Sequence, residues 1–104
     1  MSEHEKTGTR EDYPGQTLVT TDHGDIQGWA RARGATPATA PGTEHGDHLG
    51  VLQFDFPGYG GDNLTEVSWD EWLGTFDQRD LEFVHQEHLR NGAASNFFQL
   101  RQRQ

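Results

Sequence analysis

Histidines and carboxylates, the side chains that most often bind metals, gather in one short segment of the sequence. The run EHGDH at residues 44–48 contains His45, Asp47 and His48. Imidazole and carboxylate groups together suit Zn²⁺, Ni²⁺ or Cu²⁺. The glycine between them predicts a loop too flexible to hold ligands in place, so we expect no metal and no other cofactor. A divalent metal site at His45, Asp47 and His48 is the alternative.

A second run of similar side chains, HQEH at residues 85–88, lies at the end of an expected strand. A spacing of three residues places His85 and His88 on opposite faces of a strand, which predicts no shared site. Ser68 and Glu71 are explained by helix capping, and the sequence contains no nucleophile elbow. We therefore expect no catalytic residue, and a small enzymatic module is an alternative.

The segment DFPGYGGD at residues 55–62 is a glycine-rich turn between a strand and a helix. Its glycines form neither a dinucleotide-binding nor a phosphate-loop pattern, and Asp55 and Asp62 would repel phosphate. Tyr59 stands at the tip, and Trp69 is the first residue of the following helix. We predict a partner-binding surface made of Asp55, Tyr59, Asp62 and Trp69. An exposed Tyr–Trp pair would also suit a sugar ring, so a carbohydrate-binding module is a further alternative.

Two helices are expected to position these residues. Asp22 can cap a first helix that carries a narrow apolar stripe and ends at Gly34, where a left-handed residue is favoured. Ser68 and Glu71 form the pattern of a capping box at the start of a second helix. The apolar face of that helix consists of Trp69, Trp72, Leu73 and Phe76.

Strands complete an expected α+β fold. Alternation predicts a strand over residues 51–56, and a hairpin joins residues 81–87 to residues 95–100 around Asn91-Gly92. Pro37 predicts that a short strand at residues 36–40 lies at a sheet edge. We expect a flexible arm at residues 1–20 and one two-layer domain at residues 21–104, without an internal repeat. Two helices would cover one face of a three- to four-stranded mixed sheet in the order α-(β)-β-α-β-β.

Charge and composition limit the partners. Seventeen acidic against eight basic residues give a net charge of −9, a field that opposes binding to nucleic acid and to anionic membranes. No apolar run is long enough to span a bilayer, and the first residues lack a secretory signal pattern, so we expect a cytoplasmic protein. The expected function is non-catalytic binding of a protein or small ligand, and an unpaired sheet edge could join a second copy as a homodimer.

Several short motifs resemble a group of small uncharacterised bacterial proteins that are sometimes labelled 1,4-alpha-glucan branching enzymes. The matching residues are Asp22-His23, Ile26, Trp29-Ala30, Arg33-Gly34, Pro37-Ala38, Gly42-Thr43, 55–59, 68–71, Phe76-Asp77, Leu81, Phe83, Ser95 and Phe97. Branching chemistry needs paired carboxylates on a barrel of about 250 residues, so the resemblance implies no such activity for 104 residues. Similar proteins carry Arg and Lys where this chain has Asn96 and Gln99, which removes an anion-binding role for the last strand.

Overall fold

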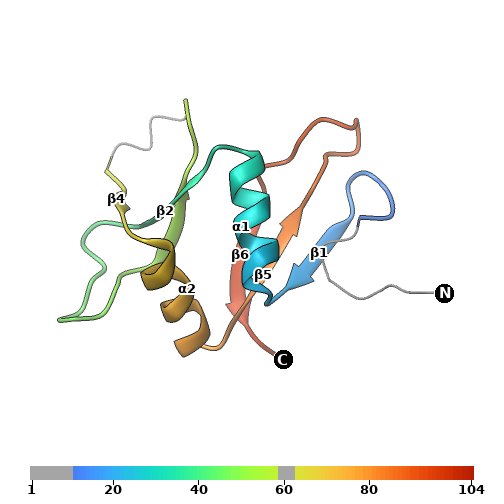
Figure 1. The fold of residues 1–104 in the computed structure, drawn as a ribbon. Helices are drawn as coiled ribbons and strands as arrows, with labels where there is room; N and C mark the ends of the chain where they lie inside the picture. Colours follow the sequence, from blue (N-terminus) through green and yellow to red (C-terminus); the bar gives the residue numbers. More distant parts are fainter. Residues whose placement is uncertain (1–10, 59–62) are drawn as a thin grey trace. The chain divides into compact units, whose positions relative to one another are not determined.

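Helices are interspersed among strands along the chain in a computed structural model that describes residues 11–58 and 63–104 (Figure 1). The elements are β1 (Thr17–Thr20), α1 (His23–Ala32), β2 (Thr36–Thr39), β3 (Leu52–Asp55), β4 (Thr65–Glu66), α2 (Trp69–Gln78), β5 (Leu81–Gln86) and β6 (Phe98–Gln102). The predicted α+β class is confirmed. Within the described residues, no helix is long and apolar enough to cross a membrane.

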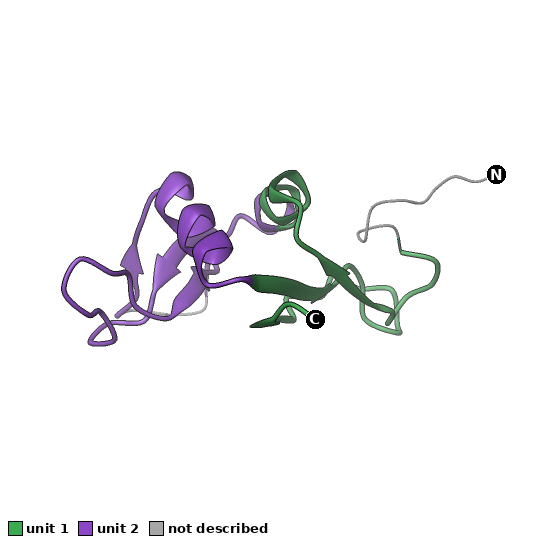
Figure 2. Ribbon diagram, turned by 90° about the horizontal axis from the view of Figure 1, so that it is seen from below, with its two compact units in different colours: residues 1–29, 81–104 green, residues 30–80 purple. Residues whose placement is uncertain are grey.

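The chain divides into two compact units, coloured separately in Figure 2. Unit 1 comprises residues 1–29 and 81–104, and its sheet has the strand order β1-β5-β6. Unit 2 comprises residues 30–80, and its sheet has the order β3-β2-β4. The last three residues of α1 therefore belong to unit 2.

The strands form two antiparallel sheets in place of the single mixed sheet that we predicted. A parallel pair needs a crossover that returns to the same sheet. Here α1 joins β1 of the first sheet to β2 of the second, and α2 joins β4 of the second sheet to β5 of the first. Neither helix returns to the sheet it left, so hairpins and distant antiparallel pairs account for the pairing.

Strand β1 was missing from the sequence-based prediction, which placed residues 1–20 in a flexible arm. It pairs with β5, where Leu18 lies opposite His85, and the side chain of Leu18 is buried. The partner strand lies more than 60 residues away, so no local pattern revealed the pairing. Residues 1–10 lie outside the described part of the chain.

Strand β2 is the central strand of its sheet, whereas Pro37 had predicted an edge strand. The proline is accommodated because it lies where the β2–β4 ladder ends. The carbonyl of Pro37 accepts from the amide of Val67 at 3.1 Å, but proline has no N–H to donate in return. This explains why β4 has only two residues and is paired through Ala38 and Thr39 alone.

The same order of elements, β-α-β-β, occurs twice, although no internal repeat was predicted. Each residue of α2 has a number 46 higher than its counterpart in α1, from 23 and 69 to 32 and 78. The hairpins have the same offset, since Thr36 lies opposite Asp55 and Glu82 lies opposite Arg101. The first strand of each β-α-β-β half pairs with the hairpin of the other half, β1 with β5 and β4 with β2. After the offset of 46 is applied, the registers of these two pairs differ by one residue.

Both helices begin and end by the same devices. A side-chain oxygen of Asp22 accepts from the amide of Asp25 at 2.9 Å, and Ser68 Oγ accepts from the amide of Glu71 at 3.0 Å. After each helix a residue takes a positive φ, 67° at Gly34 and 59° at Asp80. Glycine takes this conformation without steric cost, and aspartate is among the residues that tolerate it.

Aromatic rings fill the core of each unit. In unit 1, Trp29 lies edge-on to Phe83 at 5.3 Å and to Phe98 at 5.9 Å between ring centroids. In unit 2, Trp72 is stacked between Phe54 at 4.8 Å and Phe76 at 5.8 Å. Each indole N–H also donates to a strand carbonyl, Trp29 to Gln86 at 2.8 Å and Trp72 to Gln53 at 2.9 Å.

Candidate binding surfaces

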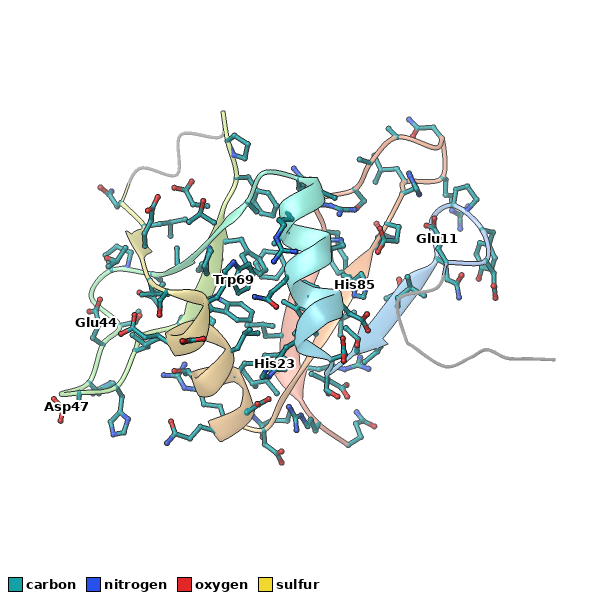
Figure 3. The ribbon with its side chains drawn as sticks, viewed as in Figure 1. Glu11, His23, Glu44, Asp47, Trp69 and His85 are labelled. Carbon is teal, nitrogen blue, oxygen red and sulfur yellow. The ribbon has the colours of Figure 1, made fainter. Side chains whose placement is uncertain are left out.

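Two of the four residues predicted as a partner surface lie in the described part of unit 2. Asp55 is the last residue of β3 and is half-buried. Trp69, labelled in Figure 3, starts α2 and packs its ring against Phe54 at 5.8 Å and Trp72 at 5.9 Å. Tyr59 and Asp62 lie outside the described residues. The described geometry thus makes Trp69 a half-buried edge of the core of unit 2.

The start of α2 explains the acidic and hydroxyl side chains that surround Trp69. Ser68 and Glu71 form the predicted capping box, in which the amide of Ser68 also donates to Glu71 Oε1 at 3.2 Å. Asp70 and Glu71 place negative charge at the positive end of the helix dipole. These groups are accounted for by helix formation, as expected from the sequence.

The predicted metal residues lie at the end of the loop between β2 and β3, where Figure 3 shows Asp47 at the outer tip. His45 and His48 pair with one another as an isolated antiparallel bridge. Their amides and carbonyls exchange hydrogen bonds of 3.3 and 2.9 Å across the two-residue turn Gly46-Asp47. Among residues 11–58 and 63–104, no group of three or more His, Cys, Asp or Glu side chains could hold a metal ion. The set of three ligands is therefore not assembled.

His85 and His88 occupy different environments, as their spacing predicted. His85 is completely buried, stacks on Phe83 at 5.1 Å, and has Nε2 3.7 Å from Glu87 Oε2. His88 is exposed, and its Nδ1 lies 2.7 Å from Glu11 Oε1. The amide of His88 also donates to the other oxygen of Glu11 at 3.1 Å. The Glu11 carboxylate therefore binds both the ring and the main chain of His88, and it links the segment before β1 to the segment after β5.

The β1-β5-β6 sheet of unit 1 has a second face, opposite α1, that was not predicted from the sequence as a binding surface. Helix α1 lies over one face of the sheet of unit 1 (Figure 2). On that face Trp29 meets Phe83 and Phe98. Because side chains alternate along strands, the residues between these point to the opposite face. We call that face the outer face and define it by Thr17, Val19, Glu82, Val84, Phe97, Gln99 and Arg101.

Apolar side chains at the centre of the outer face are exposed. Val19 is 37% exposed and lies opposite Val84, which is buried, and Phe97, at the level of Gln86, is 45% exposed. The amide of Gln86 donates to the carbonyl of Phe97, so the β5–β6 register continues to this residue. At the other end of the face, Arg101 Nε donates to a carboxylate oxygen of Glu82.

A sequence signal for the outer face was present in the doublet Phe97-Phe98. Consecutive residues of a strand point to opposite faces, so two adjacent phenylalanines cannot both face the core. Phe98 lies in the ring cluster with Trp29, and Phe97 is directed away from it. The sequence predicted a strand over residues 95–100, and alternation alone does not say which of the two rings faces the core.

A shallow hollow of about 660 Å³ adjoins the outer face at the end of the sheet. It is lined by Tyr13, Pro14, Gly15, Gln16, Thr17 and Arg90. Thr17 belongs to both the hollow and the outer face, so the two surfaces are continuous. Tyr13, which is 61% exposed, adds an aromatic side chain to this end of unit 1.

Comparisons with known proteins do not identify this chain: no family model, no curated protein and no solved structure matches it.

Proposed function

We propose that this chain is a small acidic, non-catalytic binding protein of the cytoplasm that docks a partner protein on the outer face of unit 1. The observation that carries the proposal is the exposure of Phe97, whose ring stands on that face while the next residue, Phe98, packs against Trp29. Aromatic residues dominate the energetics of many interfaces because they bury a large area with few rotatable bonds.

The residues around Phe97 support a docking role. Val19 extends the apolar centre, and Thr17 and Gln99 provide polar groups at its border. Burying a fully exposed side chain of this kind contributes roughly 1.5–3 kcal/mol, and Phe97 and Val19, which are 45% and 37% exposed, would each contribute a corresponding part. The strands beneath them are paired throughout, so a partner would meet a preorganised surface and would order little of the chain on binding.

The charge of the chain indicates what surrounds the apolar patch on the partner. With a net charge of −9, long-range attraction favours a partner whose docking patch is apolar at the centre and basic at the rim. A second copy would bring the same negative charge and would be repelled. Association with the partner should therefore slow as the salt concentration rises.

Position 51 of unit 2 offers a matched control for Phe97. Val51 lies 46 residues earlier, immediately before β3, and is 49% exposed. The test replaces residue 97 or residue 51 by a photocrosslinking phenylalanine analogue in the full chain and crosslinks in a lysate of the source organism. We expect one defined protein to crosslink from position 97 and not from position 51. Phe97→Ser should abolish its capture by the chain, and Val51→Ser should leave capture unchanged.

Other outcomes would overturn the proposal in distinguishable ways. Capture that survives Phe97→Ser would exclude the outer face. Loss of capture with Trp69→Ala, but not with Phe97→Ser, would return the partner to the surface predicted around Asp55 and Trp69. A doubled mass in native mass spectrometry that Phe97→Ser restores to a monomer would identify a second copy as the occupant and contradict the charge argument.

A further inference from the structure

The histidine pair at the tip of the β2–β3 loop has the geometry of a chelate, and this inference is independent of the proposed function. His45 and His48 lie directly opposite one another and exchange both main-chain hydrogen bonds. Opposite residues of an antiparallel pair project on the same face, with Cβ atoms about 4.5–5.5 Å apart. Two imidazole nitrogens bound to one tetrahedral ion lie about 3.3 Å apart, given metal–nitrogen distances of about 2.0–2.1 Å. Side chains of this length can converge to that separation.

The turn itself sets this arrangement. Gly46 has a φ of 58°, and Asp47 has a negative φ. A two-residue hairpin turn with glycine at its first central position joins antiparallel strands tightly. Gly46 is therefore the residue that allows the two histidines to face each other, although the sequence predicted that it makes the loop flexible.

The base of the loop is held by hydrogen bonds. The amide of Ala40 donates to Val51 O at 2.9 Å. Thr43 Oγ1 donates to Ala40 O at 2.6 Å and accepts from the amide of Val51 at 2.8 Å. A Cβ at Gly50 would lie 1.9 Å from Thr43 Oγ1, so the two segments of the loop are in close contact. These contacts join the two loop segments that carry His45 and His48.

Helix α2 holds the loop from the side. The Arg79 guanidinium donates to Gly50 O at 2.8 Å and also to Leu49 O. Below the tip, Asp47 and His48 line a hollow of about 170 Å³ together with residues of α2 and the loop. The sequence predicted a loop too flexible for ligands, whereas main-chain hydrogen bonds and the Arg79 contacts hold this loop at several positions.

Both imidazoles are available to a ligand. His45 and His48 are exposed, and within the described residues neither ring forms a hydrogen bond, ion pair or ring contact. His88 differs, because Glu11 already binds its ring. The carboxylates of Glu44 and Asp47 and the net charge of −9 favour a cation near this loop.

We propose that His45 and His48 together bind one borderline divalent transition-metal ion, such as Zn²⁺, Ni²⁺ or Cu²⁺, and that water fills its remaining positions. Neutral imidazole suits these ions, whereas Ca²⁺ and Mg²⁺ require sets of oxygen ligands. Two protein ligands leave the ion open to exchange, so the site is one for reversible capture of metal. This differs from the three-ligand site that the sequence suggested, because Asp47 is not required.

The test titrates ZnCl₂ into the untagged full chain in chelator-free buffer, followed by calorimetry and by the imidazole signals in NMR spectra. We expect one ion per chain, with shifts confined to His45 and His48. His45→Ala and His48→Ala should each weaken binding about tenfold or more, because each leaves a single imidazole without its neighbour. His23→Ala, which removes an exposed histidine from α1, should leave the affinity unchanged. CaCl₂ should not compete.

A variant outside the ligands tests whether the loop preorganises the pair. Thr43→Val keeps the shape of the side chain and removes the hydroxyl that bridges Ala40 and Val51. It should weaken Zn²⁺ binding about threefold while leaving both ligands in place, because part of the preorganisation is lost. The proposal is overturned if Zn²⁺ binding is not saturable, if His45→Ala or His48→Ala leaves the affinity unchanged, or if His23→Ala abolishes binding.

Discussion

Unit 1 and unit 2 have the same strand order and the same helix devices, but they are built from different side chains. In each unit an indole N–H donates to a strand carbonyl, from Trp29 in one and Trp72 in the other. The rings around them differ: Phe54 and Phe76 stack on Trp72, whereas Phe83 and Phe98 meet Trp29 edge-on. Features common to both units serve the fold, and features found in one unit are the better candidates for function.

The outer strands illustrate the difference. Val51 and Phe97 hold the same position 46 residues apart, and both are exposed. The position is therefore outward in both units, but only unit 1 places an aromatic ring there. The loops differ in a similar way: each contains an isolated bridge, His45 with His48 and His88 with Ala94. The bridge in unit 2 consists of two histidines, whereas the bridge in unit 1 contains one histidine, His88, whose ring is bound by Glu11.

The largest expected effects come from the two buried tryptophans. Trp72→Ala and Trp29→Ala should each lower the free energy of unfolding by about 3–5 kcal/mol, since each removes a fully packed ring. Urea denaturation measures the loss, and hydrogen exchange should locate it in β2–β3 for Trp72 and in β5–β6 for Trp29. If an alanine variant does not fold, Trp72→Phe serves as a milder variant that removes the N–H and part of the ring together, with an expected loss of about 1–3 kcal/mol. A loss below about 1 kcal/mol for either alanine variant would remove that ring from the core.

The adjacent phenylalanines of unit 1 should differ sharply. Phe98→Ala removes a ring that packs on Trp29 and Phe83, and it should cost about 2–3 kcal/mol because Phe98 is only partly buried. Phe97→Ala should change the free energy of unfolding by less than about 0.5 kcal/mol, as for other surface substitutions. Equal losses measured in urea would mean that the outer face is part of the core.

Local signals in the sequence predicted the helices closely. Asp22 and Ser68 cap α1 and α2 as expected, Gly34 ends α1, and the apolar stripes of both helices are buried except for the half-buried Trp69. Strands β2, β3, β5 and β6 were also predicted, because alternation and turn residues act over a few positions, whereas the two-residue strand β4 was not. These features depend on neighbours in the chain, so the sequence contains them directly.

Features that depend on distant partners were missed. Strand β1 is short, and it is stabilised by β5 at the other end of the chain. The repeat was hidden because Gly34 and Asp80, or Asp22 and Ser68, perform the same task with different side chains. The His45–His48 loop is also contacted by Arg79, whose guanidinium donates to main-chain carbonyls some 30 residues away. No spacing rule connects these residues.

The two caps should be similar in size but different in their response to salt. Asp22→Ala and Ser68→Ala should each cost about 1 kcal/mol, because each leaves a helix amide without its acceptor. Asp22 also places a full charge at the start of α1, so part of its contribution should be lost in 1 M NaCl. The contribution of the uncharged Ser68 should change little. Urea denaturation at two salt concentrations measures both, and equal salt sensitivity would contradict the assignment.

The smallest effects are expected where the helices end, and there α1 and α2 should respond with opposite signs. Gly34 has a φ of 67° and Asp80 a φ of 59°. Gly34→Ala should destabilise by about 1 kcal/mol, because a Cβ is strained at this φ. A Cβ at Gly34 would meet only the Pro57 ring, with Cγ at 3.4 Å and Cδ at 3.8 Å, which are ordinary contacts, so the loss would report backbone strain.

Asp80→Gly should stabilise by about 0.5 kcal/mol, because the strain at a non-glycine residue is relieved and is offset in part by the greater freedom of glycine in the unfolded chain. Asp80→Asn serves as the control, since asparagine also tolerates this conformation and keeps a polar side chain of the same size. Thermal unfolding of the three variants decides the question. If Asp80→Gly destabilises while Asp80→Asn does not, the side chain at position 80 contributes more than its backbone costs, and the ends of α1 and α2 are equivalent in shape but not in energy.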